Sequence, residues 1–125
     1  MTIHEAIDNL DEMKPNMMSN RLKIAALGRL DGLIMSEIIS KHEGAEDYPA
    51  FTGYTEETDP GTVLLAPWPY DEMYTYWLMA EVDRQTMETD KYNNDMVTFN
   101  QKYEMFHDYW RRNHMPLTNV RELRI

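Results

Sequence analysis

The feature that most constrains the fold is a run of large apolar side chains over residues 92–110. They recur at alternating spacings of four and three residues, which is the pattern of a helix that packs lengthwise against another helix. The run therefore predicts an all-α fold, a small bundle of roughly three or four helices. Its members are Tyr92, Met96, Phe99, Tyr103, Phe106 and Trp110.

The same register, extended backwards, is interrupted before it resumes. It meets the polar residues Thr89 and Gln85 and only then the apolar Val82 and Leu78. We therefore expect a turn or kink near residues 85–91 between two helices, with one long helix as the alternative. Pro69 suits the first turn of this helical region, and the proline at position 116 is expected to end it.

Two further helices are predicted in the first third of the chain. Thr2, followed by Glu5 three residues later, is typical of a capping box at the start of a helix over residues 2–14. A second helix is expected to begin at residues 19–20, to continue to about residue 42 and to end in a left-handed cap at Gly44. Gly28 and Gly32 lie inside it, where glycine costs about 1 kcal/mol relative to alanine. Their presence predicts the close approach of another backbone.

Residues 43–68 are predicted to form a long loop, because proline and glycine recur throughout them. Within it, residues 62–66 form either a short extended stretch or a buried connection. Residues 117–125 lack periodicity and are interpreted as an irregular C-terminal tail. The predicted organisation is a helical domain over residues 1–116 followed by that tail, which together are the size of one domain.

Composition narrows the classes of function. The chain has 125 residues, no cysteine and a formal net charge of −10. The lack of cysteine excludes disulfides and thiol nucleophiles, and the acidity opposes general binding of nucleic acid. No apolar stretch approaches the about 20 residues of a membrane span. The first residues lack the pattern of a signal peptide, so we expect a protein made and kept in water without membrane contact.

The sequence contains no recognisable catalytic or metal-binding motif. His107 and His114 are seven residues apart, which is not the spacing of a helical metal-binding pair. Neighbouring acids such as Asp71 and Glu72 point in different directions on a helix. We expect no catalytic residue, no metal site and no cofactor, and hence no enzyme. The alternative is an enzyme or ligand-binding domain with its site in the Met- and Tyr-rich core, which predicts a deep pocket with buried polar groups that lack partners.

Several blocks of the sequence together resemble a known family. They are residues 64–74 (LLAPWPYDEMY), 76–77 (YW), 90–94 (DKYNN), 99–100 (FN) and 110–116 (WRRNHMP). In this order they are similar to the head–tail adaptor (connector) proteins of long-tailed bacteriophages and prophages of Gram-positive bacteria. Members of that family tend to carry a glycine near the position of residues 86–88, and this chain has none there.

The resemblance implies a structural virion protein without cofactors. It predicts a homo-oligomeric ring of about a dozen copies, a closed symmetric assembly. The ring would bind below the portal protein and carry a downstream neck or tail-completion protein. It would lie at the head–tail interface of the virion after assembly in the host cytoplasm, and DNA would pass through its lumen without specific binding.

Charge and exposed aromatic residues supply the candidate contacts. The stretch 42–60 carries acids and no lysine or arginine, whereas residues 111–125 carry four arginines. Such surfaces either bind a partner or are simply solvated. Trp68 is either an exposed anchor or a residue packed over the end of the bundle. The candidates for partner contact are Trp68, Tyr70, Glu56, Glu57, Asp59, Arg111, Arg112, Arg121 and Arg124.

A different class of function stays open beside the adaptor. A small acidic phage protein can act as a regulator that binds a host protein or another phage protein, in one form by imitating the charge of nucleic acid. That hypothesis predicts a stable monomer or dimer with its acids gathered on one exposed face, whereas the adaptor hypothesis predicts a ring.

Overall fold

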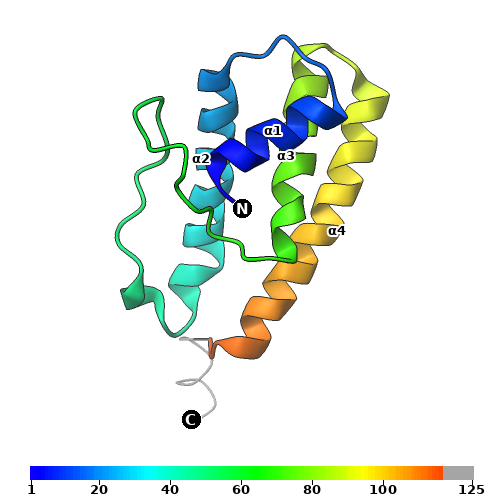
Figure 1. The fold of residues 1–125 in the computed structure, drawn as a ribbon. Coiled ribbons are helices and arrows are strands. Elements are labelled where there is room, and N and C mark those ends of the chain that lie inside the picture. Colours follow the sequence, from blue (N-terminus) through cyan, green and yellow to red (C-terminus); the bar gives the residue numbers. More distant parts are fainter. Residues whose placement is uncertain (117–125) are drawn as a thin grey trace.

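The computed structural model describes residues 1–116 and is all-α (Figure 1). Its four helices are α1 (Ile3–Met13), α2 (Asn20–Glu37), α3 (Met73–Gln85) and α4 (Thr89–Asn113). Three single-turn 3-10 helices lie at Ile39–Lys41, Ala45–Asp47 and Tyr70–Glu72. The described part of the chain has no strand, only isolated bridges between Thr2 and Val63 and between His42 and Pro116. The prediction of a small helical bundle is confirmed.

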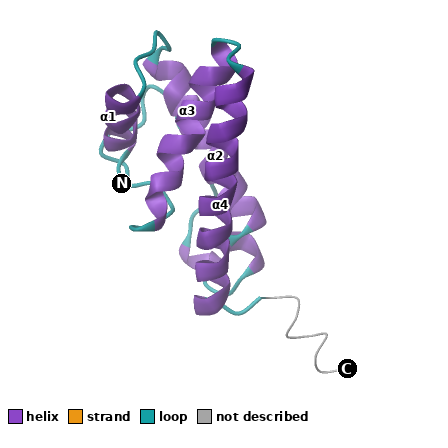
Figure 2. Cartoon of the chain, turned by 90° about the vertical axis from the view of Figure 1, so that its right-hand side faces the viewer, coloured by secondary structure: helices purple, strands orange, loops and turns teal. Residues whose placement is uncertain are grey.

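Helix α3 lies at the centre of the arrangement. It runs antiparallel to both α2 and α4 and packs most extensively on α4 (Figure 1). Helix α1 crosses α2 and α3, and Figure 2 shows it on one side of the bundle. The connection 14–19 and the turn 86–88 meet at one end, whereas the end of α4 and the beginning of the long loop meet at the other.

The first helix begins as the sequence predicts. Thr2 accepts a hydrogen bond from the Glu5 backbone N–H at 3.1 Å, and Glu5 accepts one from the Thr2 N–H at 2.9 Å. This reciprocal pair satisfies backbone donors that would otherwise lack partners at a helix start. The Ile3 N–H also donates to the Thr62 carbonyl at 3.0 Å, so the start of α1 holds the end of the long loop.

The second helix is shorter than predicted. It begins after the Ser19 cap, as expected, but ends at Glu37 instead of near residue 42. The Ile38 carbonyl faces the His42 ring, with Nδ1 2.6 Å away, and also accepts from the Lys41 N–H at 3.3 Å. Because these bonds replace the next α-helical one, the chain tightens into a 3-10 turn. Gly44 adopts the predicted left-handed conformation, with φ of 91°, but it precedes the next 3-10 turn instead of ending α2.

The two glycines of α2 differ in what approaches them. A Cβ atom at Gly28 would lie 2.8 Å from the backbone nitrogen of Tyr54, so another backbone does pass closely there. A Cβ atom at Gly32 would lie 3.7 Å from the ring of Phe51, an ordinary contact with a side chain. The prediction of a close backbone approach is therefore confirmed at Gly28 and wrong at Gly32.

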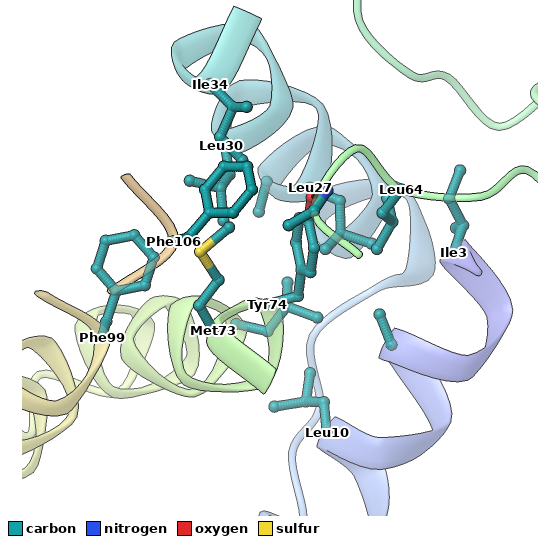
Figure 3. Packing of buried hydrophobic residues seen from close by; sticks show 14 of the residues in the cluster. Ile3, Leu10, Leu27, Leu30, Ile34, Leu64, Met73, Tyr74, Phe99 and Phe106 are labelled. Carbon is teal, nitrogen blue, oxygen red and sulfur yellow. Dashed lines mark hydrogen bonds between the residues drawn. The ribbon is translucent and has the colours of Figure 1, made fainter. Parts of the chain in front are cut away.

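The core is continuous across all four helices. Figure 3 shows side chains from α1, α2, α3 and the loop converging on one cluster, with Phe99 and Phe106 from α4 closing its other side. Within the apolar run of α4, Phe99, Phe106 and Trp110 are buried and the other three members are half-buried. Leu64 and Ala66 are also buried, so the end of the loop is a buried connection.

A turn separates α3 from α4, so the alternative of one long helix is wrong. Helix α3 ends at Gln85 and α4 begins at Thr89. Between them Met87 has φ of 59°, in the left-handed region that favours glycine. Its side chain is 88% exposed. The turn therefore forms with a methionine where the resemblance leads one to expect a glycine.

Candidate interaction surfaces

Trp68 is the most prominent exposed side chain of the aromatic set. It is 82% exposed, although tryptophan is usually largely buried. Pro67 and Pro69 flank it and restrict the backbone on both sides. The side chain borders a groove of about 410 Å³ that Met13 and Tyr76 also line. The interpretation of Trp68 as a residue packed over the bundle end is wrong, because the ring faces solvent.

Tyr70 has a different role from Trp68. Its ring stacks on Tyr109 with centroids 4.6 Å apart and lies 6.1 Å from the ring of Phe106. It is half-buried. Tyr70 therefore holds the corner that carries Trp68 against α4.

The three candidate acids of the loop lie on the surface. Glu56 and Glu57 are exposed, and Glu56 lies 3.8 Å from the guanidinium of Arg21, with both side chains mostly in solvent. Such an exposed pair contributes little to stability. Asp59 accepts a hydrogen bond from the Gly61 N–H at 2.8 Å and so shapes a turn. Glu56 and Glu57 also line a hollow of about 530 Å³ together with Arg21.

The basic end lies beside the beginning of the acidic loop. The Glu43 N–H donates to the Met115 carbonyl at 2.8 Å, which brings the end of α4 against residues 42–43. Arg111 pairs with Asp108 one turn earlier, and Arg112 is exposed. The two segments are therefore not wholly separate surfaces of the subunit. Arg121 and Arg124, and with them the predicted tail, lie outside the described residues.

A buried carboxylate that the sequence analysis did not single out organises the loop. Asp31 is fully buried on α2. Its Oδ2 accepts from the Tyr54 hydroxyl at 2.5 Å and from the Leu65 N–H at 3.2 Å. Its Oδ1 accepts from the Tyr74 hydroxyl at 2.5 Å, which in turn accepts from the Ala66 N–H at 2.9 Å. Both oxygens of Asp31 therefore accept hydrogen bonds from within the chain.

Burial dominates the ionisation of this network. It raises the pKa of Asp31, against the opposing effect of its three hydrogen-bond donors. Burial and the neighbouring Asp31 carboxylate raise the pKa of both Tyr54 and Tyr74. The available signal was the position of Asp31 itself, which lies three residues before Ile34 and four after Leu27 on the apolar face.

A second polar cluster ties α1 to the pair formed by α3 and α4. Lys14 donates to Asp83 and, at 3.0 Å, to Asp95. Asp83 is fully buried, and its Oδ2 has no hydrogen-bond partner among the described residues. Burial and the adjacent Asp95 raise the pKa of Asp83. Burial lowers the pKa of Lys14, but the neighbouring carboxylates of Asp83 and Asp95 outweigh this effect, so the pKa of Lys14 is raised. Sequence spacing offers no signal for this three-helix contact.

An uncharged groove lies at the end of the bundle where residues 14–19 meet the turn 86–88. It has a volume of about 400 Å³. None of its lining side chains is ionisable, although more than a quarter of the chain is charged. Met17 protrudes beside it, fully exposed. We call this surface the methionine groove; its lining residues are Asn16, Met17, Met18, Ser19, Leu22, Val82, Gln85 and Thr86.

The described residues form neither a metal site nor a membrane-spanning helix. No group of three or more histidine, aspartate or glutamate side chains in residues 1–116 is arranged to hold a metal ion. None of the four helices is long and apolar enough to cross a membrane.

No family model matches the chain, and neither the curated proteins nor the solved structures contain one that is significantly similar to it.

Proposed function

We propose that this chain is a structural subunit of a phage virion, a head–tail adaptor that forms an oligomeric ring below the portal and joins the capsid to the tail. The observation that supports it best is the exposed Trp68 on a small bundle whose other large aromatic side chains are packed or half-packed. Tryptophan is among the residues that most often carry the energy of a protein interface.

The shape of the site favours a protein partner over a small molecule. Trp68 projects from a corner that two prolines and the Tyr70 stack hold in place. A side chain presented by a restrained backbone loses less conformational entropy on binding. The groove beside it is open, and its lining includes the exposed Met13. Its lining mixes exposed apolar side chains with acids such as Glu12 and Glu72, and protein interfaces likewise combine aromatic residues and methionine with a polar rim.

Charge is compatible with a DNA channel. The net charge of −10 repels phosphates, so a lumen lined by this chain would let DNA pass without holding it. The partners in this proposal are further copies of the chain, the portal protein and a downstream neck protein. None of these contacts requires a cofactor or a catalytic residue.

The proposal is tested by sizing chromatography with light scattering on the chain alone and with the portal protein of the same phage or prophage. We expect a ring-sized species, alone or on the portal, and a Trp68→Ala variant that assembles less. A matched Met105→Ala variant, which also removes an exposed apolar side chain, should assemble normally. A chain that stays monomeric and ignores the portal at every salt concentration would reject the adaptor and favour the acidic regulator.

A further inference from the structure

We propose that Trp68 of one copy inserts into the methionine groove of the next copy, and that this contact links neighbouring subunits. The inference rests on the proposed function, because it names the partner of the Trp68 surface within the ring. The contact joins two surfaces that no other part of the described chain covers: the protruding ring of Trp68 and the uncharged methionine groove.

The two surfaces match in size and chemistry. The groove holds about 400 Å³, within the about 300–1,000 Å³ of pockets that enclose small organic molecules. Met17, Met18 and Leu22 give it adaptable apolar walls, and methionine sulfur makes favourable contacts with aromatic rings. Gln85 and Thr86 supply polar atoms at its side, which suit the single N–H of an indole.

The distribution of charge also favours this groove over the rest of the acidic surface as the site that receives Trp68. Two copies with a net charge of −10 each repel one another over most of their surfaces. A contact in which neither the inserted side chain nor the receiving walls are ionisable buries no charge without a partner. Three acids, Glu12, Asp71 and Glu72, lie with Trp68 along the groove between α1 and α3. Asp71 is paired with the N-terminal ammonium group at 3.3 Å, and Glu72 is paired with Lys102 at 3.4 Å.

The positions of the two surfaces require the contact to be between copies. Trp68 precedes the start of α3, whereas Val82 and Gln85 of the methionine groove lie at its end (Figure 1). The 13 residues of α3 span about 20 Å, and the corner is held to α4, so a chain cannot fill its own groove. A contact between two different surfaces of identical subunits repeats from copy to copy and closes into a ring when the rotation permits.

The test uses two variants that each damage one surface, Trp68→Ala and Met17→Glu. Both side chains are exposed, so neither change removes a core contact. Met105→Glu, on the outer face of α4, introduces the same charge at another exposed methionine and serves as the control. Association is measured for each chain alone by analytical ultracentrifugation over a range of concentrations, together with the circular dichroism spectrum as a check on folding.

The proposal predicts that the wild-type chain and Met105→Glu associate alike, and that each groove or tryptophan variant loses at least about 30-fold in association constant, the loss typical of a central interface residue. A mixture of Trp68→Ala with Met17→Glu should form a dimer and no larger species. The first variant retains its groove and the second retains its tryptophan, so one intact contact per pair remains. Trp68→Phe should recover part of the association.

Tryptophan emission gives an independent readout. Trp110 is buried and Trp77 half-buried, so a shift of the emission to shorter wavelength on association reports chiefly on Trp68. Met17→Glu should abolish that shift.

Unimpaired association of either variant overturns this inference, as does a mixture that forms no dimer, and a wild-type chain that never self-associates overturns it too. In each case the adaptor proposal survives if the wild-type chain still binds the portal. The absence of both self-association and portal binding rejects the two proposals together.

Discussion

The hydroxyl of Tyr74 donates a hydrogen bond of 2.5 Å to Oδ1 of Asp31 and so joins α3 to α2 in the centre of the bundle. The same hydroxyl accepts the Ala66 N–H at 2.9 Å. Ala66 lies two residues before Trp68. The buried network therefore fixes the path by which the long loop returns to the bundle, and with it the corner from which Trp68 projects.

Replacement of Tyr74 by phenylalanine should destabilise the fold by about 1–3 kcal/mol, because the change leaves a buried carboxylate oxygen and a buried N–H without a partner. Urea denaturation followed by circular dichroism measures the loss. Tyr109→Phe, which changes a half-buried tyrosine outside the network, should cost much less. Equal losses for the two variants would contradict the role of the Tyr74 hydroxyl.

The Asp31 carboxylate should give stability a pH dependence of definite sign. Burial raises the pKa of Asp31 above its ordinary value of 3.8. The unfolded chain therefore releases this proton first, and the contribution of Asp31 to stability is greatest below pH 3.8 and falls as pH rises through the raised pKa. Asp31→Asn lacks this proton. The difference in unfolding free energy, wild type minus variant, should fall between pH 3 and pH 7, and a rise would contradict the account.

The two glycines of α2 should respond differently to alanine. At Gly32 the added methyl group meets only an ordinary contact with Phe51, so the better helix propensity should stabilise the chain by about 0.5–1 kcal/mol. At Gly28 the methyl group would lie 2.8 Å from the Tyr54 backbone nitrogen, and the forced shift should destabilise by about 1–3 kcal/mol. Thermal unfolding of both variants decides the point. Similar melting temperatures would show that the loop does not press on Gly28.

Lys14 should be needed to balance two neighbouring carboxylates. Lys14→Met leaves the buried Asp83 and the adjacent Asp95 without their cation, and it should cost about 3 kcal/mol. The double variant Lys14→Met with Asp83→Leu should recover part of the loss, since an apolar pair replaces an uncompensated charge. Lys91→Met, at the exposed pair with Glu88, should change stability by less than about 0.5 kcal/mol. A double variant less stable than Lys14→Met would contradict the cluster's electrostatic basis.

Replacement of Met87 by glycine should stabilise the protein. The left-handed conformation costs a residue with a Cβ about 1–2 kcal/mol, and glycine loses about 0.4–1 kcal/mol of this advantage through its freer unfolded chain. Met87→Gly should therefore stabilise the protein by up to about 1 kcal/mol in chemical denaturation. Met17→Gly, at a fully exposed methionine that does not have positive φ, should not stabilise it.

The spacing of apolar residues was enough to predict the helices, whereas the long-range polar contacts could not be predicted from it. The spacing from Tyr92 to Trp110 and the capping pair Thr2 and Glu5 are local signals, so the helices could be predicted. The end of α2 could not, because it depends on how the His42 ring meets the Ile38 carbonyl. Lys14 reaches Asp83 across 69 positions of sequence, and no local pattern encodes such a contact.

Of the two candidate surfaces, the sequence singled out Trp68 but not the methionine groove, for a similar reason. Trp68 between two prolines was a local signal, although its exposure needed the structure to decide between two interpretations. The methionine groove needed residues 16–22 and 82–86 to be brought together by the packing of α2 and α3. Its members are apolar or neutral and carry no motif, so the sequence alone did not distinguish it from ordinary core and surface.

Native mass spectrometry of the wild-type chain, alone and mixed with the portal protein of the same phage or prophage, tests the central claim most directly. The account predicts that the chain assembles into a closed ring of about a dozen copies, alone or bound to the portal, since identical heterologous contacts close into a ring when the rotation between copies permits. A monomer or a simple dimer under both conditions, at every concentration and ionic strength examined, would contradict it.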